Sequence, residues 1–142
     1  MKEQELRQAL GAMEVYKAQL EGIGEQQQLI QMSIEELTRA KVSLTDVIKS
    51  EVGDDVLIPV GSASFVKAKV SDNKNALIGV GTGITMEKPI EDAMMLIEKR
   101  LQEMLDAGKK LHESRQIIEM KAAQLNQVLE AEYQRMGGAP AP

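Results

Sequence analysis

The run of residues that most invites a chemical interpretation is Gly79-Val80-Gly81-Thr82-Gly83. Glycine-rich loops cradle phosphate groups when they follow a strand, keep a defined spacing and open directly into a helix. This run has the spacing of neither the dinucleotide fingerprint nor the P-loop, and no helix pattern begins immediately after it. We therefore interpret its glycines as a source of curvature in a β-strand. We expect the protein to need no nucleotide or other cofactor.

The chain lacks the residues that catalysis and metal binding require. The chain has no cysteine and a single histidine, His112, which completes neither a catalytic set nor a typical zinc site. Adjacent carboxylates such as Glu35 and Glu36 lie in a helical pattern, where we interpret them as solvated surface charge. The sequence therefore predicts no catalytic residue, no metal site and no enzyme activity.

Charge and hydropathy exclude several classes of partner. The net charge is −5 and no basic stripe is visible, which argues against a nucleic-acid partner. No stretch approaches the roughly eighteen apolar residues of a membrane span, so we expect no membrane contact. Residues 1–5 lack the apolar region of a secretory signal. The expected location is the cytoplasm.

The elements that position the side chains are mainly helical. From Ile90 to Met136 an apolar position recurs every four, then three, residues, and only Gly108, Arg115 and Glu132 interrupt it. Such a period, sustained over this length, is typical of a coiled-coil seam that needs a partner helix. We expect Arg115 to extend its charge to solvent or to pair with a carboxylate across the coil.

Residues 3–50 supply the partner pattern. Its seam is interpreted as Leu6, Leu10, Met13, Lys17, Leu20, Ile23, Gln27, Ile30, Ile34, Leu37, Lys41, Leu44 and Ile48. The step from Leu20 to Ile23 is three residues where four are due, and Gly22 and Gly24 flank it. A missing residue in the heptad phase strains a supercoil, and glycine weakens a helix. We therefore predict a shift of the heptad register near Gly22 and Gly24, and a helix that is locally less stable or bent at that place.

Between the helices, over about residues 52–87, the period changes to that of β-strands. Pro59 indicates an edge or a strand end, and residues 71–75, Ser-Asp-Asn-Lys-Asn, indicate a turn. Short strands bury too little apolar surface to close their own edges, so we expect this segment to assemble with other subunits. The predicted assembly face comprises Ile58, Val60, Val66, Val70, Ile78, Val80 and Ile84.

The predicted architecture is a single α+β domain over residues 1–142. Helices at 3–50 and 89–136 form a long antiparallel two-helix coiled coil, and two β-hairpins at 52–87 join the inner helix ends. Both chain ends then lie at the far tip, where residues 137–142 form a disordered tail.

These segments, taken in order, resemble the alpha-type subunit of prefoldin. The resemblance covers the whole chain and is most specific over residues 57–88. It is carried by a long helix followed by residues 56–62, Val-Leu-Ile-Pro-Val-Gly-Ser, by residues 77–83, Leu-Ile-Gly-Val-Gly-Thr-Gly, and by Glu87-Lys88 before the second helix. Room for two hairpins rather than one favours the alpha type over the beta type.

The resemblance implies an ATP-independent molecular chaperone. In that family two alpha and four beta subunits assemble through their hairpins into a double β-barrel platform. The coiled-coil tips hold unfolded proteins and pass them to a group II chaperonin. The client-binding residues at the tip would then be Leu6, Leu10, Met13, Leu125, Val128, Leu129, Tyr133 and Met136. Flexible leucine and methionine side chains suit ill-defined apolar clients, and several weak tips acting together raise avidity.

Other interpretations stay open on the residues alone. From periodicity, closed seam packing explains the tip residues as well as client contact does, and only the resemblance favours contact. A coiled-coil structural adaptor that recognises one defined partner is the alternative to a chaperone. A nucleic-acid-binding helical arm is a third class, which the acidic balance of the chain disfavours.

Overall fold

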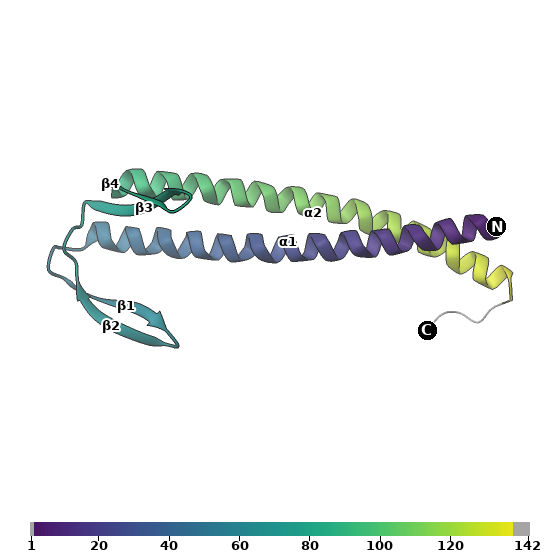
Figure 1. Ribbon diagram of the computed structural model, residues 1–142, viewed down its shortest axis with the longest axis horizontal. Coiled ribbons are helices and arrows are strands. Elements are labelled where there is room, and N and C mark those ends of the chain that lie inside the picture. The colour runs from purple at the N-terminus through teal and green to yellow at the C-terminus, as the bar shows by residue number, and fades with distance from the viewer. Residues whose placement is uncertain (1, 138–142) are drawn as a thin grey trace. The chain divides into compact units, whose positions relative to one another are not determined.

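The computed structural model describes residues 2–137. In chain order its elements are helix α1 (Glu3–Lys49), strands β1 (Asp55–Gly61), β2 (Ser64–Lys69), β3 (Asn75–Gly81) and β4 (Ile84–Pro89), and helix α2 (Ile90–Arg135) (Figure 1). Two long helices and two antiparallel hairpins confirm the predicted α+β class. Each helix end lies within one residue of its expected position, whereas the hairpin segment extends to Pro89.

Packing divides the chain into two compact units. The helical unit consists of the described residues up to Met32 and from Leu105 onward, and the hairpin unit consists of residues 33–104. Residues 138–142, which make up most of the expected tail, lie outside the described part of the chain. Among residues 2–137, no helix is both long and apolar enough to cross a bilayer.

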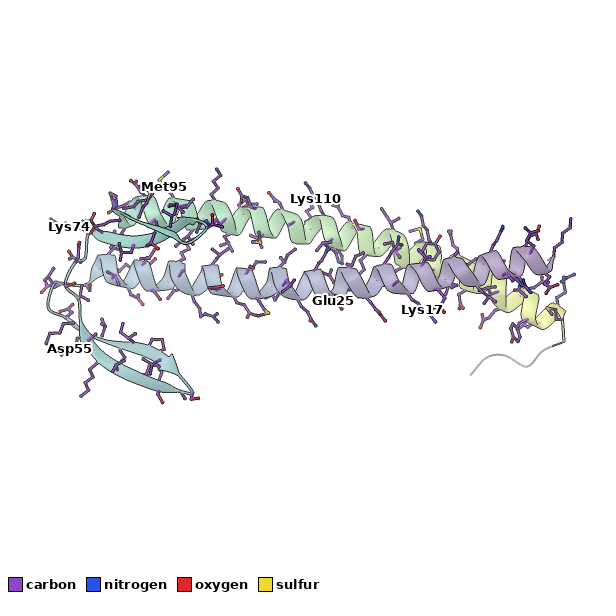
Figure 2. All side chains as sticks on the ribbon, viewed as in Figure 1. Lys17, Glu25, Asp55, Lys74, Met95 and Lys110 are labelled. Atoms are coloured by element: carbon purple, nitrogen blue, oxygen red, sulfur yellow. The ribbon has the colours of Figure 1, made fainter. Side chains whose placement is uncertain are left out.

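In the helical unit, α1 presents one unbroken heptad seam. Its positions advance by alternating steps of three and four residues: Leu6, Ala9, Met13, Tyr16, Leu20, Ile23, Gln27 and Ile30, all partly buried. Leu10 and Lys17 are exposed and lie outside this seam, and Figure 2 shows Lys17 on the outer side of the helix. Ala9 and Tyr16 hold the places that the prediction assigned to those two residues. The predicted register shift is therefore wrong, and the three-residue step after Leu20 is regular.

Gly108 and Arg115 interrupt the apolar seam of α2 within the helical unit, and each lies close to a residue of α1. A methyl group added at Gly108 would stand 3.6 Å from Ile30 Cγ2, an ordinary contact distance. Arg115 donates from Nη1 to Gln27 Oε1 across the coil, and from Nε to Glu119 Oε1 at 3.1 Å on its own helix. The partner across the coil is thus an amide, and the carboxylate partner of Arg115 lies on the same helix.

The core of the hairpin unit forms where β3 packs against α1 and α2. Ile78 is 8% exposed and clusters with Ala93 and Ile97 of α2. Around this cluster pack Leu37, Ala40, Leu44, Ala76 and Leu96. Figure 1 shows the β3–β4 hairpin folded back alongside the start of α2. Arg100 fastens this hairpin, since its Nη2 donates to the Gly79 carbonyl oxygen at 2.7 Å.

The two hairpins repeat each other at an offset of twenty residues, as residues 57–61 read Leu-Ile-Pro-Val-Gly and residues 77–81 read Leu-Ile-Gly-Val-Gly. The strand pairing repeats as well. Ile58 and Ile78 each face an apolar residue of the following strand, and both ladders shift register at the same place, one residue beyond that pair. The β1–β2 and β3–β4 hairpins therefore present equivalent apolar faces.

The turn of the first hairpin carries backbone strain. Ser62 and Ala63 have φ values of 47° and 56°, a left-handed conformation that glycine or asparagine adopts more readily. In the second hairpin the place equivalent to Ala63 is held by Gly83, with φ 72°. The first turn is thus formed by residue types that suit it poorly.

Candidate functional site

The end of the helical unit that holds the start of α1 and the close of α2 carries an apolar cleft, here called the tip cleft. Its lining comes from both helices and consists of Leu6, Leu10, Leu129, Glu132, Tyr133 and Met136. The cleft has a volume of about 370 Å³. Apart from Glu132, every one of these residues belongs to the predicted tip set. The structure thus places those side chains around one space.

A neighbouring cleft of about 440 Å³ takes in the other predicted tip residues of α2. It is lined by Ala12, Tyr16, Lys121, Gln124, Leu125 and Val128. Met13, the last member of the predicted tip set, is half-buried in the seam. The heptad period locates these residues at one end of the coil, but it does not separate those that line a cleft from those that close the seam.

Exposure separates the surface of the tip from its packed interior. Leu10, Tyr133 and Met136 are 52%, 55% and 67% exposed, whereas Leu6 and Leu129 are half-buried. The half-buried leucines hold the two helices together. The exposed side chains leave an apolar surface beside them, and a concave apolar surface of this kind can accept an apolar side chain from another molecule.

Glu132 is the residue of the tip cleft that the predicted tip set missed. It is 9% exposed, and Arg135 donates to both of its carboxylate oxygens, at 3.2 Å from Nε and 2.6 Å from Nη2. These hydrogen bonds lower the pKa of the Glu132 carboxyl and raise that of the Arg135 guanidinium. The pair keeps an acid ionised within an apolar lining. Its i, i+3 spacing on a helix is the sequence signal that would have found it.

The predicted assembly face of the hairpins is only partly available to another molecule. Ile58, Val60, Val66, Val80 and Ile84 are 36% exposed or more. The other two members, Val70 and Ile78, are each 8% exposed because the chain itself covers them. They support the hairpins from within and offer little surface. Large apolar side chains outside the predicted face are also exposed: Leu57, Phe65, Leu77 and Met86.

The part of the chain that the structure describes contains no cluster of potential metal ligands. Within residues 2–137 no three His, Cys, Asp or Glu side chains gather closely enough to hold a metal ion.

Comparison with known proteins places the whole pattern in one family. The sequence matches the family model described as Prefoldin subunit over residues 16–135. It is similar to the prefoldin subunit alpha of Methanococcus aeolicus, at 33% identity over 130 residues that cover 86% of this chain and 90% of the relative. It is also similar to the prefoldin subunit alpha of Methanothrix thermoacetophila, at 34% identity over 110 residues, which cover 78% and 72%.

Solved structures share the fold. A cryo-EM structure of filamentous PFD from Methanocaldococcus jannaschii matches with a TM-score of 0.70 and 26% identity, covering 82% of this chain and 97% of that one. The crystal structure of the prefoldin beta subunit from Thermococcus strain KS-1 matches with a TM-score of 0.56 and 17% identity, covering 90% and 91%. The second is a likeness of fold alone.

Proposed function

The chain belongs to the prefoldin family, and we propose that it is the alpha-type subunit of a cytoplasmic chaperone that holds unfolded proteins at its tip and delivers them to a group II chaperonin. Membership in this family implies a chaperone role. The observation that carries the proposal is the tip cleft, where large apolar side chains from both helices stay exposed.

The chemistry of the tip suits partners without a fixed shape. Unfolded chains present scattered apolar side chains, and an exposed apolar surface binds them by removing that area from water. Leu10 and Met136 are unbranched at Cβ and flexible, so they adapt to different side chains, whereas Tyr133 adds a large flat surface. Each contact is weak, and tight holding requires several tips on one assembly.

Substitution at the tip tests this assignment. In the variant Leu10→Ser/Tyr133→Ser/Met136→Ser, we expect suppression of the aggregation of unfolded substrates to fall at least about tenfold, because the apolar area at the tip is lost. The native mass of the assembly should not change. Light scattering with several unrelated denatured proteins measures suppression.

A matched control comes from the same helical unit. Three large apolar side chains of this unit are exposed and lie outside both the tip cleft and the neighbouring cleft: Leu29 (65%), Ile117 (55%) and Met120 (63%). The variant Leu29→Ser/Ile117→Ser/Met120→Ser should suppress aggregation as the wild type does. Equal losses in the two variants would defeat the tip assignment. Protection of no unrelated substrate by the wild type would favour the adaptor with one defined partner.

The hairpins are the proposed route of assembly. We propose that Ile58, Val60, Val66, Val80 and Ile84 contact beta-type subunits, with two alpha and four beta subunits in the complex. Exposed apolar strands with free edges support this, since a two-stranded ribbon gains stability by pairing further. The alternative is a filament of this chain alone, which the likeness to filamentous PFD favours.

Native mass spectrometry separates the two assemblies. The chain is measured alone and after co-expression with a beta-type subunit. A hetero-hexamer that forms only with the second subunit supports the first proposal, whereas long homopolymers of the chain alone support the filament.

A further inference from the structure

The tip cleft combines an apolar lining with one ion pair. Among the described residues that line it, Glu132 alone is charged. Arg135 binds this carboxylate through two N–H groups, from Nε at 3.2 Å and from Nη2 at 2.6 Å. The Arg135 side chain is 65% exposed, whereas that of Glu132 is 10% exposed. The guanidinium therefore lies at the rim of the cleft, held in place by an acid of the lining.

Arg135 keeps hydrogen-bond donors that this ion pair does not use. A guanidinium carries five N–H donors, and the bidentate contact with Glu132 takes two of them. Within residues 2–137 the remaining N–H groups of Arg135 have no acceptor. Because most of this side chain is exposed, those donors are available to another molecule.

An unfolded segment that enters the cleft needs such donors. Burial of its apolar side chain also removes the neighbouring main-chain carbonyl oxygens from water, and each of them then requires a donor. Leucine and methionine have no donor, and an ionised glutamate only accepts. Apart from the Tyr133 hydroxyl, the described lining therefore supplies no side-chain donor, and the guanidinium at the rim is the group that can complete the contact.

The charge of the ion pair decides which segments it suits. Hydrogen bonds from Arg135 lower the pKa of the Glu132 carboxyl, so the acid stays ionised and its charge cancels that of the guanidinium. A pair without net charge can donate hydrogen bonds but does not favour acidic segments over basic ones, whereas an uncompensated arginine would favour acidic segments.

We propose that Arg135, positioned and neutralised by Glu132, determines which segments the tip cleft accepts. These are extended segments that place an apolar side chain in the cleft and a main-chain carbonyl oxygen against the guanidinium, whatever charge their flanking residues carry. The inference rests on the proposed holding of clients at the tip and names the class of segment that is held. Arg135 contacts the client, and Glu132 is a positioning residue.

Replacement of Glu132 by its amide tests the role of the charge. Glu132→Gln keeps the size of the side chain and leaves the charge of Arg135 uncompensated. Two fluorescent peptides with the same leucine-rich core, one flanked by aspartates and one by lysines, are titrated against the full chain in its native assembly at physiological salt. The wild type should discriminate little between them. Glu132→Gln should shift the ratio of affinities toward the aspartate peptide about three- to fivefold, and high salt should reduce this shift.

Removal of the whole pair separates hydrogen bonding from apolar burial. Glu132→Leu/Arg135→Leu leaves no unpaired charge and makes the cleft more apolar, so apolar contact alone would tighten binding. We expect the opposite, a loss of about threefold or more for both peptides, because the client carbonyl oxygens lose their donor. Circular dichroism checks that the helices stay folded.

The control is a second ion pair on the same helix. Glu119→Gln removes the acid that pairs with Arg115 at 3.1 Å, outside both clefts, and should leave the wild-type ratio unchanged. An unchanged ratio in Glu132→Gln, or tighter binding by the double leucine variant, would overturn the inference and leave the client proposal standing. If Leu10→Ser/Tyr133→Ser/Met136→Ser binds both peptides as the wild type does, the tip assignment fails and the inference fails with it.

Discussion

At the scale of single residues, one polar layer helps to define the seam of the helical unit. Arg115 and Gln27 meet across the coil, where apolar side chains occupy the layers on both sides. A polar pair at such a position costs stability relative to leucine, but it disfavours any register in which either group loses its partner. The interruption at Arg115 is thus a specificity element in the seam.

Replacing the two polar residues together or singly should have opposite effects. Arg115→Leu leaves the Gln27 side chain partly buried without this donor, so the free energy of unfolding should fall by about 1 kcal/mol. Gln27→Leu/Arg115→Leu fills the layer with apolar groups and should exceed the wild type by about 1 kcal/mol. Urea unfolding followed by circular dichroism measures both. Glu119→Gln, which removes only the same-helix ion pair, is the control, and a double variant weaker than the single one would contradict this account.

The first hairpin turn offers a second test at the residue scale. Ala63 has φ 56°, a conformation that costs an L-residue with a Cβ about 1–2 kcal/mol, so Ala63→Gly should stabilise the β1–β2 hairpin by about 0.5–1 kcal/mol after the entropy cost of glycine. Gly83→Ala makes the reverse exchange in the β3–β4 hairpin and should destabilise it. Hydrogen exchange of the strand amides reports each hairpin separately. Slower opening in Gly83→Ala would contradict the strain argument.

At the scale of elements, the helices follow from the sequence because one period spans dozens of residues. The ends of α1 and α2 lie within one residue of the bounds that the apolar period predicts. Before Leu20 the apolar pattern alone predicts the wrong seam in α1, because Leu10 is more apolar than Ala9 and Lys17 follows Met13 in the same phase, whereas Ala9 and Tyr16 are the partly buried residues. Phase continuity from the regular part of the helix decides these positions, whereas the hydrophobicity of single residues does not.

Replacing Gly22 and Gly24 tests whether these glycines weaken α1, whose heptad register is continuous. The helix runs through both, and apart from the adjacent residues and the helix's own backbone no atom lies within 4 Å of a methyl group added at either position. Gly22→Ala/Gly24→Ala should therefore stabilise the chain by about 2 kcal/mol in total and slow amide exchange around Ile23. Gly53→Ala is the control, because its φ of 95° makes a side chain costly. Unchanged exchange around Ile23 would show that the glycines do not weaken the helix.

The hairpins show what periodicity leaves undetermined. Strand alternation puts Ile58 and Ile78 on equivalent faces, yet only Ile78 is covered by the helices. That difference depends on tertiary packing and on the hydrogen bond from Arg100 to the Gly79 carbonyl, and neither leaves a short-range sequence pattern. The repeat of residues 57–61 at 77–81 was readable from the sequence, and it would have shown the equivalence of the two hairpins.

At the scale of the whole molecule, assembly through the hairpin unit should determine how tightly the helical unit holds an unfolded client. A single tip presents a cleft of about 370 Å³, which limits the affinity for one apolar segment. Several tips linked in one particle bind a long unfolded chain at high effective concentration, so avidity exceeds the affinity of one tip. Loss of assembly should therefore weaken client holding even when every tip is intact.

The variant Val60→Asp/Ile84→Asp separates these two contributions. Val60 and Ile84 are 63% and 59% exposed on the two hairpins, so the charges should block association without disturbing a packed core. We expect native mass spectrometry to show dissociated subunits, and half-maximal suppression of aggregation to require at least about tenfold more protein. Leu29→Asp, a change at an equally exposed site of the helical unit, should alter neither measurement. Because the tips are the same in both variants, full suppression by dissociated subunits would mean that one tip suffices and that avidity plays no part in client holding.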